Sequence, residues 1–260
     1  PATTFAEQPP AEKKGLLVSG FRIRDGHHAV TGSTPLDLAE ATEASCNIFY
    51  ALVSLRTGGG SLTSMAADFG FGTAIPFDLP TAISRVTSGD GSAPGGFEDD
   101  VELASASFGQ AETYVTPIQM ALVAATVAND GILMKPHLVT ALTGDGSGAR
   151  TIGPEVWRRV LAGNDARAIQ EAMQQAVEGP IGRQFTSGAK VAGVPTAGKS
   201  GTAELGGSGE PHSWFIGFAP VENPKIAIAV LVERGGRGGD RAAPLAGDLL
   251  TKYFELYGRP

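Results

Sequence analysis

The sequence has a single cysteine, Cys46, among 260 residues, so no disulfide bond can form within the chain. The four histidines have no second cysteine with which to complete a zinc site, and they do not show the i, i+4 spacing of a helical zinc site. We therefore expect no structural metal ion, and we expect no cofactor.

Long apolar runs and an excess of positive charge are also missing. The longest aliphatic run covers residues 226–232, whereas a helix that spans a bilayer needs about 20 residues. The formal net charge of −7, from 20 basic and 27 acidic side chains, argues against a nucleic-acid partner, because such a partner requires a basic face. The start at Pro1 rather than at a methionine indicates a piece of a longer protein.

The composition is 42% hydrophobic, which is sufficient for a sizeable core. Start and stop signals predict helices at residues 35–44, 49–57, 62–69, 117–128, 165–178 and 244–254. Strands are predicted at residues 199–204, 213–219 and 225–233, with extended segments at 132–134 and 137–142 and a long loop at 71–100. Helices followed by a run of strands indicate an α+β fold, in which helices flank an antiparallel sheet.

The tripeptide Lys199, Ser200 and Gly201 matches two motifs. With Gly193 and Gly198 it fits the phosphate loop G-x-x-x-x-G-K-[ST], and alone it fits the K-[ST]-G element of active-serine penicillin-recognising enzymes. A phosphate loop must open a helix, but glycines and a proline follow here, so we expect no nucleotide site. The tripeptide is predicted to lie on one strand of a β-hairpin.

Ser45, Cys46 and Asn47 interrupt a predicted helical stripe. Serine and asparagine at such a junction are most often helix caps, which is the plain interpretation. The downstream Lys-Ser-Gly favours a catalytic role instead, because Ser-x-Asn, Lys-[ST]-Gly and an upstream Ser-x-x-Lys are the elements that active-serine enzymes share.

Further segments resemble the transpeptidase domain of class B penicillin-binding proteins, in the order of that family and over residues 16–257. They are residues 44–50 (ASCNIFY), 108–111 (FGQA), 115–121 (VTPIQMA), 127–132 (VANDGI), 134–137 (MKPH), 197–204 (AGKSGTAE) and 214–220 (WFIGFAP). The resemblance implies a β-lactamase/transpeptidase-like fold whose N-terminal part is missing. It also implies one incomplete domain over residues 1–260, with an extended segment at 1–34, a mainly helical region at 35–180, and strands with a C-terminal helix at 190–260.

The resemblance also implies roles for the first motif residues. In the family, a lysine activates the nucleophilic serine when its own charge is suppressed. Lys199 would supply the second cation that suppresses this charge, and it would also steer a substrate carboxylate. Ser45 would relay a proton toward the leaving amine, since a hydroxyl both accepts and donates. Asn47 would hold the peptide-like side chain of the substrate. These three residues are the predicted catalytic set.

Ser200, Gly201 and Thr202 are the predicted substrate-binding residues. The hydroxyls of Ser200 and Thr202 would bind the terminal carboxylate of a D-alanyl peptide or of a β-lactam. The backbone amide of Thr202 would be an oxyanion-hole donor. The serine at position 200 replaces the family's usual threonine and keeps the hydroxyl. We also expect Gln110 to order a loop near the cleft.

The nucleophile is where the sequence departs from the family. No Ser-x-x-Lys precedes Ser45, where the family places this element. The one match in the chain, residues 187–190, comes in the wrong order and is interpreted as a coincidence in a solvated loop. We therefore expect the 260-residue chain to be inactive without the missing serine.

The resemblance implies a bacterial peptidoglycan D,D-transpeptidase that cross-links the cell wall, binds stem peptides and is a target of β-lactam antibiotics. The parent would be membrane-anchored at the extracytoplasmic face, with partners in cell division or elongation. A non-catalytic penicillin-binding-like sensor or scaffold remains an alternative. A soluble β-lactamase is a third, but no Glu-x-x-x-Asn deacylation element is evident.

Overall fold

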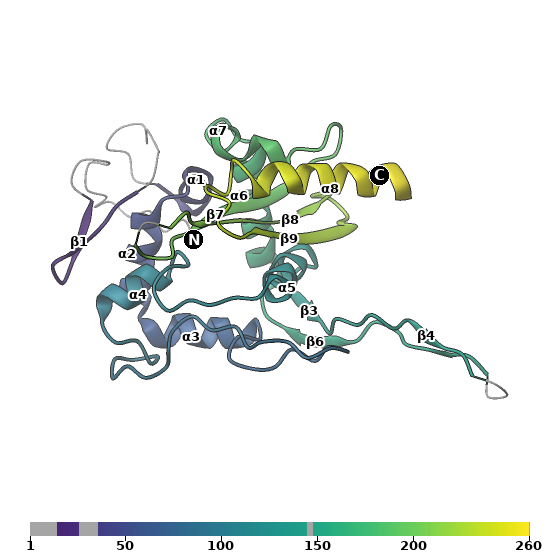
Figure 1. Ribbon diagram of the computed structural model, residues 1–260, viewed down its shortest axis with the longest axis horizontal. Helices are drawn as coiled ribbons and strands as arrows, with labels where there is room; N and C mark the ends of the chain where they lie inside the picture. The colour runs from purple at the N-terminus through teal and green to yellow at the C-terminus, as the bar shows by residue number, and fades with distance from the viewer. Residues whose placement is uncertain (1–14, 26–35, 145–147, 208, 260) are drawn as a thin grey trace.

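The computed structural model describes residues 15–25, 36–144, 148–207 and 209–259 (Figure 1). The helices are α1 Leu38–Ala44, α2 Asn47–Thr57, α3 Gly59–Asp68, α4 Asp100–Ala106, α5 Pro117–Ala128, α6 Gly163–Glu178, α7 Arg183–Thr186, the 3-10 turn η1 Ser187–Ala189 and α8 Ala242–Tyr257. The strands are β1 Leu16–Val18, β2 Phe21–Ile23, β3 Ile132–Met134, β4 Ala141–Leu142, β5 Arg150–Thr151, β6 Val156–Arg159, β7 Ala197–Ala203, β8 His212–Ala219 and β9 Ile226–Val232. The predicted α+β class is confirmed.

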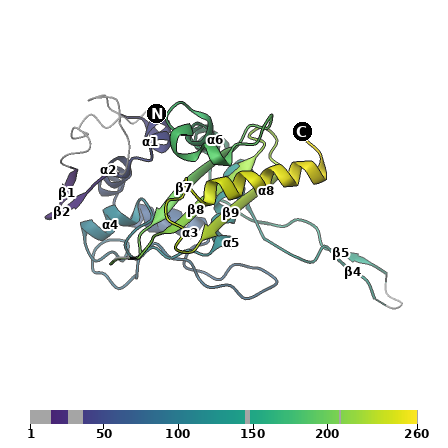
Figure 2. The ribbon, with the colours of Figure 1, turned by 45° about the horizontal axis from the view of Figure 1, so that its top comes forward.

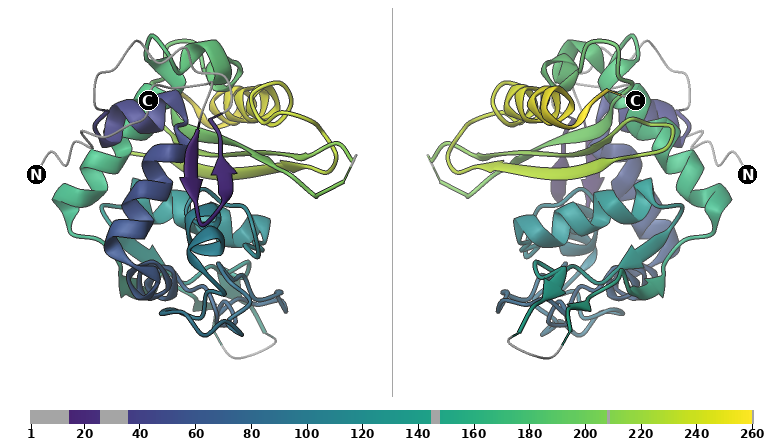
Figure 3. Two further views of the ribbon diagram at one scale, coloured as in Figure 1. Left: turned by 90° about the vertical axis from the view of Figure 1, so that its left-hand side faces the viewer. Right: turned by 90° about the vertical axis from the view of Figure 1, so that its right-hand side faces the viewer.

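The sheet β7-β8-β9 is an antiparallel meander, and the three predicted strands match it to within two residues at each end. Helix α8 lies on one face of the sheet and α5 on the opposite face (Figures 2 and 3). Side chains alternate between these faces. Phe215 is fully buried with alanines of α8, whereas Phe218 is fully buried with residues of α5 and α6, so one strand supplies both halves of the core.

The predicted break separates α1 from α2, but it covers only Ser45 and Cys46, because α2 begins at Asn47 rather than at Phe49. The predicted start of α1 at Pro35 is wrong, because the helix begins at Leu38 and Asp37 forms a reciprocal capping box with Glu40. The predicted cap at Ser61 is also wrong. The left-handed Gly58 turns the chain directly into α3, and the Ser61 hydroxyl donates to the carbonyl of Thr57 instead.

The helix predicted at residues 117–128 is confirmed: α5 begins at Pro117, with Thr116 as its N-cap, and ends at Ala128. The region 71–100 is irregular, as predicted. The structure adds elements that the sequence did not indicate, among them α4, capped by Asp99, β6, which pairs with β3, and the short elements β5, α7 and η1. Strands β4 and β5 form an arm that projects from the body (Figure 1).

The predicted N-terminal segment, residues 1–34, lies mostly outside the described residues, which include only residues 15–25 of it, with the β1–β2 hairpin. Across the described ranges, no helix combines the length and the apolar character needed to cross a bilayer. The same ranges hold no cluster of three or more potential metal ligands.

Candidate active site

The structure brings Ser45 and Lys199 together, although 154 positions separate them in the sequence. Ser45 follows the last residue of α1, and Lys199 is the third residue of β7. The Lys199 ammonium donates hydrogen bonds to Ser45 Oγ at 2.9 Å and to the Ser200 carbonyl at 2.8 Å. Ser45 is exposed, so this pair is open to a ligand from solvent.

Ser45 has a left-handed backbone, with φ 56° and ψ 46°. For a residue with a Cβ this conformation is strained and often marks a functional position. The Ser45 amide bonds the carbonyls of Ala41 and Thr42, which closes α1, and Cys46 then caps α2 through its sulfur. The junction therefore ends one helix, starts another and presents the Ser45 hydroxyl between them.

Burial lowers the pKa of Lys199 from 10.5 to about 8. The side chain keeps some exposed surface, but its ammonium group lies among the atoms of the surrounding elements. Its hydrogen-bond partners among the described residues are a hydroxyl and a carbonyl, neither of which carries charge. Lys199 is therefore a cation at neutral pH that loses its proton readily just above it.

Asn47 is oriented by the segment that follows β2. Its amide Nδ2 donates to the Arg24 carbonyl at 3.1 Å. Next to it, Asp25 accepts the Ile48 amide at 3.0 Å and the Cys46 thiol at 3.3 Å. Residues 24–25 thus hold the first turn of α2, and with it the Ser-x-Asn element.

The pKa of the Cys46 thiol tests whether residues 24–25 hold the first turn of α2. Burial, followed by the charge of Asp25, raises the pKa of Cys46 to about 12. We expect Asp25→Asn to lower that pKa only in part, because burial is the larger cause. The rate of iodoacetamide labelling against pH measures it. Asp37→Asn is the matched control, since Asp37 caps α1 and does not contribute to the pKa of Cys46; an unchanged pKa in Asp25→Asn would contradict this role of residues 24–25.

The other predicted residues lie further along β7. Ser200 and Thr202 alternate with Lys199 and so lie on the other face of the strand. Ser200 Oγ is 3.3 Å from Thr186 Oγ1, and Thr202 Oγ1 accepts the Gly238 amide at 3.1 Å. Gly201, between them, is partly exposed.

Strand β7 has β8 on one side and is the outer strand of its sheet. An outer strand leaves alternate backbone groups available for a ligand that adds as a further strand. The Thr202 carbonyl is already used, because Gln110 Nε2 donates to it at 3.0 Å. Gln110 therefore ties the loop before α5 to this edge.

The Ser-x-x-Lys match at residues 187–190 is not part of this site. Ser187 and Lys190 are exposed. Between them, Gly188 lies against Pro244 of α8, so the segment sits on the α8 side of the sheet, whereas Lys199 lies on the other side. The match is therefore not brought to Ser45 and Lys199. The prediction of a solvated loop is wrong, because residues 187–189 form the 3-10 turn η1 and Ala189 is buried against α8.

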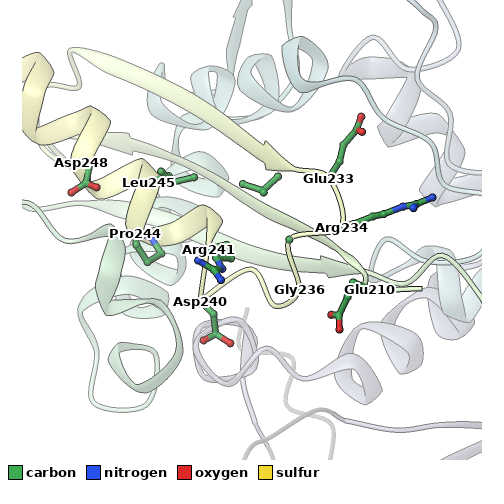
Figure 4. Close-up of a pocket in the computed structure, with 11 residues that line it drawn as sticks. Glu210, Glu233, Arg234, Gly236, Asp240, Arg241, Pro244, Leu245 and Asp248 are labelled. Carbon is green, nitrogen blue, oxygen red and sulfur yellow. The ribbon is translucent and has the colours of Figure 1, made fainter. Parts of the chain in front are cut away.

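A separate open hollow of about 750 Å³ lies between the first turns of α8 and residues 233–241 (Figure 4). Its lining has no hydroxyl, thiol, imidazole or amine side chain; the charged members are Glu210, Glu233, Arg234, Asp240, Arg241 and Asp248. We therefore place the candidate active site at Ser45 and Lys199.

Sequence reasoning missed two anchors of the site, Asp25 and Glu43. Glu43 Oε1 accepts the amides of Ile181 at 2.8 Å and Gly182 at 3.2 Å, which joins α1 to the turn after α6. Asp25 stood in what was interpreted as an ordinary Asp-Gly turn, and Glu43 in an ordinary helix. Neither position carried a local signal for a contact so distant in the chain.

The model of the penicillin binding protein transpeptidase domain family matches residues 9–251. Peptidoglycan D,D-transpeptidase PbpA of Mycolicibacterium smegmatis is 40% identical over 219 residues, which are 81% of this chain and 42% of that protein. PbpA of Mycobacterium tuberculosis is 37% identical over 228 residues, 84% of this chain and 44% of that protein. The chain thus spans less than half the length of these curated relatives.

Solved structures of a penicillin-binding protein are also similar to this chain. Penicillin-binding protein A from M. tuberculosis, as its penicillin G acyl-enzyme complex, has a TM-score of 0.75 at 31% identity and covers 96% of this chain and 56% of that chain. Its ceftriaxone acyl-enzyme complex has a TM-score of 0.73 at 34% identity, over 83% of this chain and 48% of that chain. These similarities confirm the β-lactamase/transpeptidase-like fold.

Proposed function

Because the chain belongs to the transpeptidase domain family of class B penicillin-binding proteins, we propose that it forms part of a peptidoglycan D,D-transpeptidase. The reaction would be acyl transfer from D-Ala-D-Ala stem peptides, which cross-links the bacterial cell wall. The observation that carries the proposal is the hydrogen bond between Lys199 and Ser45, because it joins the family's Lys-[ST]-Gly and Ser-x-Asn elements.

The proposed roles follow from where the groups lie. Lys199 would attract a substrate carboxylate, and Ser45, in contact with it, would pass a proton toward the leaving amine. Asn47 would hold the stem peptide, with its amide oriented by Arg24. The backbone amide of Thr202, on the outer edge of β7, would stabilise the oxyanion, and a peptide that adds to this edge as a strand would replace Gln110 at the Thr202 carbonyl.

We propose β-lactam antibiotics as ligands of the whole protein, because the M. tuberculosis relative forms acyl-enzymes with penicillin G and ceftriaxone. We also propose a membrane-anchored parent at the extracytoplasmic face, where peptidoglycan is cross-linked, with partners from division or elongation. A non-catalytic sensor or scaffold is the second candidate, and a reading frame that encodes no Ser-x-x-Lys upstream of these residues would favour it.

Labelling with a fluorescent penicillin tests the proposal. We expect no stable adduct on the 260-residue chain, and a stable adduct on the same chain extended by the upstream part of its reading frame, at the serine of a Ser-x-x-Lys. Lys199→Ala in the extended chain should reduce labelling by about 10²-fold, on the scale of losing one electrostatic group of an active site.

Two outcomes would decide against parts of this proposal. An extended chain that has no Ser-x-x-Lys, or is not labelled when folded, would favour the sensor or scaffold. A penicillin that stays attached to Ser45 or Ser187 of the 260-residue chain after denaturation would show that this piece is active by itself.

A further inference from the structure

Ser45 and Lys199 meet the geometric requirement for a nucleophile and its base. Their atoms are 2.9 Å apart, within the distance at which a lysine amine can take a proton from a serine hydroxyl. Serine with lysine is a known variant of the catalytic triad.

We propose that Ser45 Oγ is itself a nucleophile, with Lys199 as its base, toward small activated acyl compounds such as aryl esters of short carboxylic acids. This activity goes beyond transpeptidation and does not depend on it. It requires neither the hydroxyls of Ser200 and Thr202, which lie on the other face of β7, nor a stem peptide.

A small ester from solvent reaches the Ser45 hydroxyl more easily than the neighbouring Cys46 thiol. Ser45 is exposed, and its left-handed backbone presents it at the corner between α1 and α2. Cys46 is 2% exposed, its sulfur accepts the Phe49 amide and its thiol donates to Asp25. A small ester from solvent therefore reaches the hydroxyl before the sulfur.

Lys199 must be neutral to act as a base, and its surroundings favour the neutral form. Burial lowers its pKa to about 8, so half of the chains hold a neutral amine near that pH. Titratable groups on the elements around β7 include Glu43 on α1, Asp25 and Cys46 at α2, Glu178 on α6, Arg183 on α7 and His212 on β8.

The carboxylates in this set are engaged by backbone amides rather than by Lys199. Glu43 accepts from Ile181 and Gly182, Asp25 accepts from Ile48, and Glu178 accepts from Thr196. No charged group among the described residues contributes to the shift of the Lys199 pKa. Burial is the one cause of its lowered pKa.

The reaction balances without a further reagent. Neutral Lys199 accepts the Ser45 proton while Oγ forms a bond to the acyl carbon and the bond from that carbon to the aryl oxygen breaks. The aryloxide leaves and takes up the proton from Lys199 or from water. Water then attacks acyl-Ser45, with Lys199 again as base, so that one ester and one water give a carboxylic acid and a phenol.

Hydrolysis of p-nitrophenyl acetate by the 260-residue chain tests the inference. We expect the rate of p-nitrophenolate release to be about 10²-fold above the rate in buffer, which is the scale of one positioned general base. This rate should rise with pH, with its midpoint near pH 8, where Lys199 loses its proton. Acid quenching followed by peptide mass spectrometry should find the acetyl group on Ser45.

Matched variants separate this site from other nucleophiles. Ser45→Gly, which suits the left-handed backbone, and Lys199→Arg, which keeps the charge but cannot lose its proton, should both return the rate to that of buffer. Ser187→Ala should keep the rate and the pH midpoint, because Ser187 is exposed and lies on the other side of the sheet. Folding of each variant is checked by circular dichroism.

Equal hydrolysis by folded Ser45→Gly, or acetylation of Lys199 nitrogen in place of Ser45, would overturn the inference. The outcome of the ester experiment does not depend on whether the whole protein is a transpeptidase. An upstream-extended chain that is labelled by penicillin, together with a 260-residue chain that does not hydrolyse the ester, would remove this inference alone.

Discussion

Replacing Gly198 with alanine should destabilise the fold and separate Lys199 from Ser45. A Cβ at position 198 would lie 2.2 Å from Cζ of Phe215 and 2.7 Å from the carbonyl oxygen of Ile216. Phe215 is fully buried against α8, so its ring cannot move aside. The strand β7 would have to shift instead, and Lys199 is the next residue.

The expected loss is about 3 kcal/mol of unfolding free energy, at the upper end of the usual range for an overpacked core. Urea unfolding measures it. Gly60→Ala is the control, because nothing lies within 4 Å of a Cβ there and the position is helical. That control should be neutral or gain about 0.5 to 1 kcal/mol, the ordinary advantage of alanine over glycine in a helix.

The effect on the site can be measured separately from the effect on stability. Isotope-edited NMR of the lysine Nζ groups should show the pKa of Lys199 rising from about 8 toward 10.5 in Gly198→Ala, as the displaced ammonium meets more water. A variant with unchanged unfolding free energy and an unchanged Lys199 pKa would show that β7 tolerates the added methyl group.

Gly198 also shows which parts of this structure the sequence could predict. Short extended segments between glycine and proline turns predicted β7, β8 and β9, and the weak helix formers at residues 45–47 predicted the break between α1 and α2. These signals are local, because each depends on residues only a few positions apart.

Contacts between distant segments were not predictable in the same way. Gly198 fitted a phosphate loop in the sequence, and its actual constraint, the ring of Phe215, comes from strand pairing. Asp25 reaches α2 across 23 positions, and Glu43 reaches Ile181 across 138. The family resemblance placed Ser45 and Lys199 in one catalytic set, but the hydrogen bond between them comes from the structure.

Replacing Lys199 with methionine should make the protein more stable at neutral pH. Methionine fills similar space without a charge that must be desolvated. The lowering of the Lys199 pKa from 10.5 to about 8 corresponds to about 3 kcal/mol between the charged and neutral forms, and the hydrogen bonds lost with the amine offset about 1 kcal/mol of it. We expect a net gain of about 2 kcal/mol at pH 7.

The sign of the pH dependence follows from the direction of the shift. Between pH 8 and 10.5 the unfolded chain keeps the Lys199 proton while the folded chain has lost it, so wild-type stability rises with pH in this window. The advantage of Lys199→Met is therefore complete below about pH 8 and disappears toward pH 10.5.

Urea unfolding at a series of pH values compares the two proteins, and Lys190→Met is the control, because it removes one exposed lysine from the same region of the chain. A stability difference that does not change between pH 7 and 10 would contradict burial as its cause. If it closes as expected, the charged lysine beside Ser45 is retained at a cost in stability, which is the pattern of a residue selected for chemistry rather than for folding.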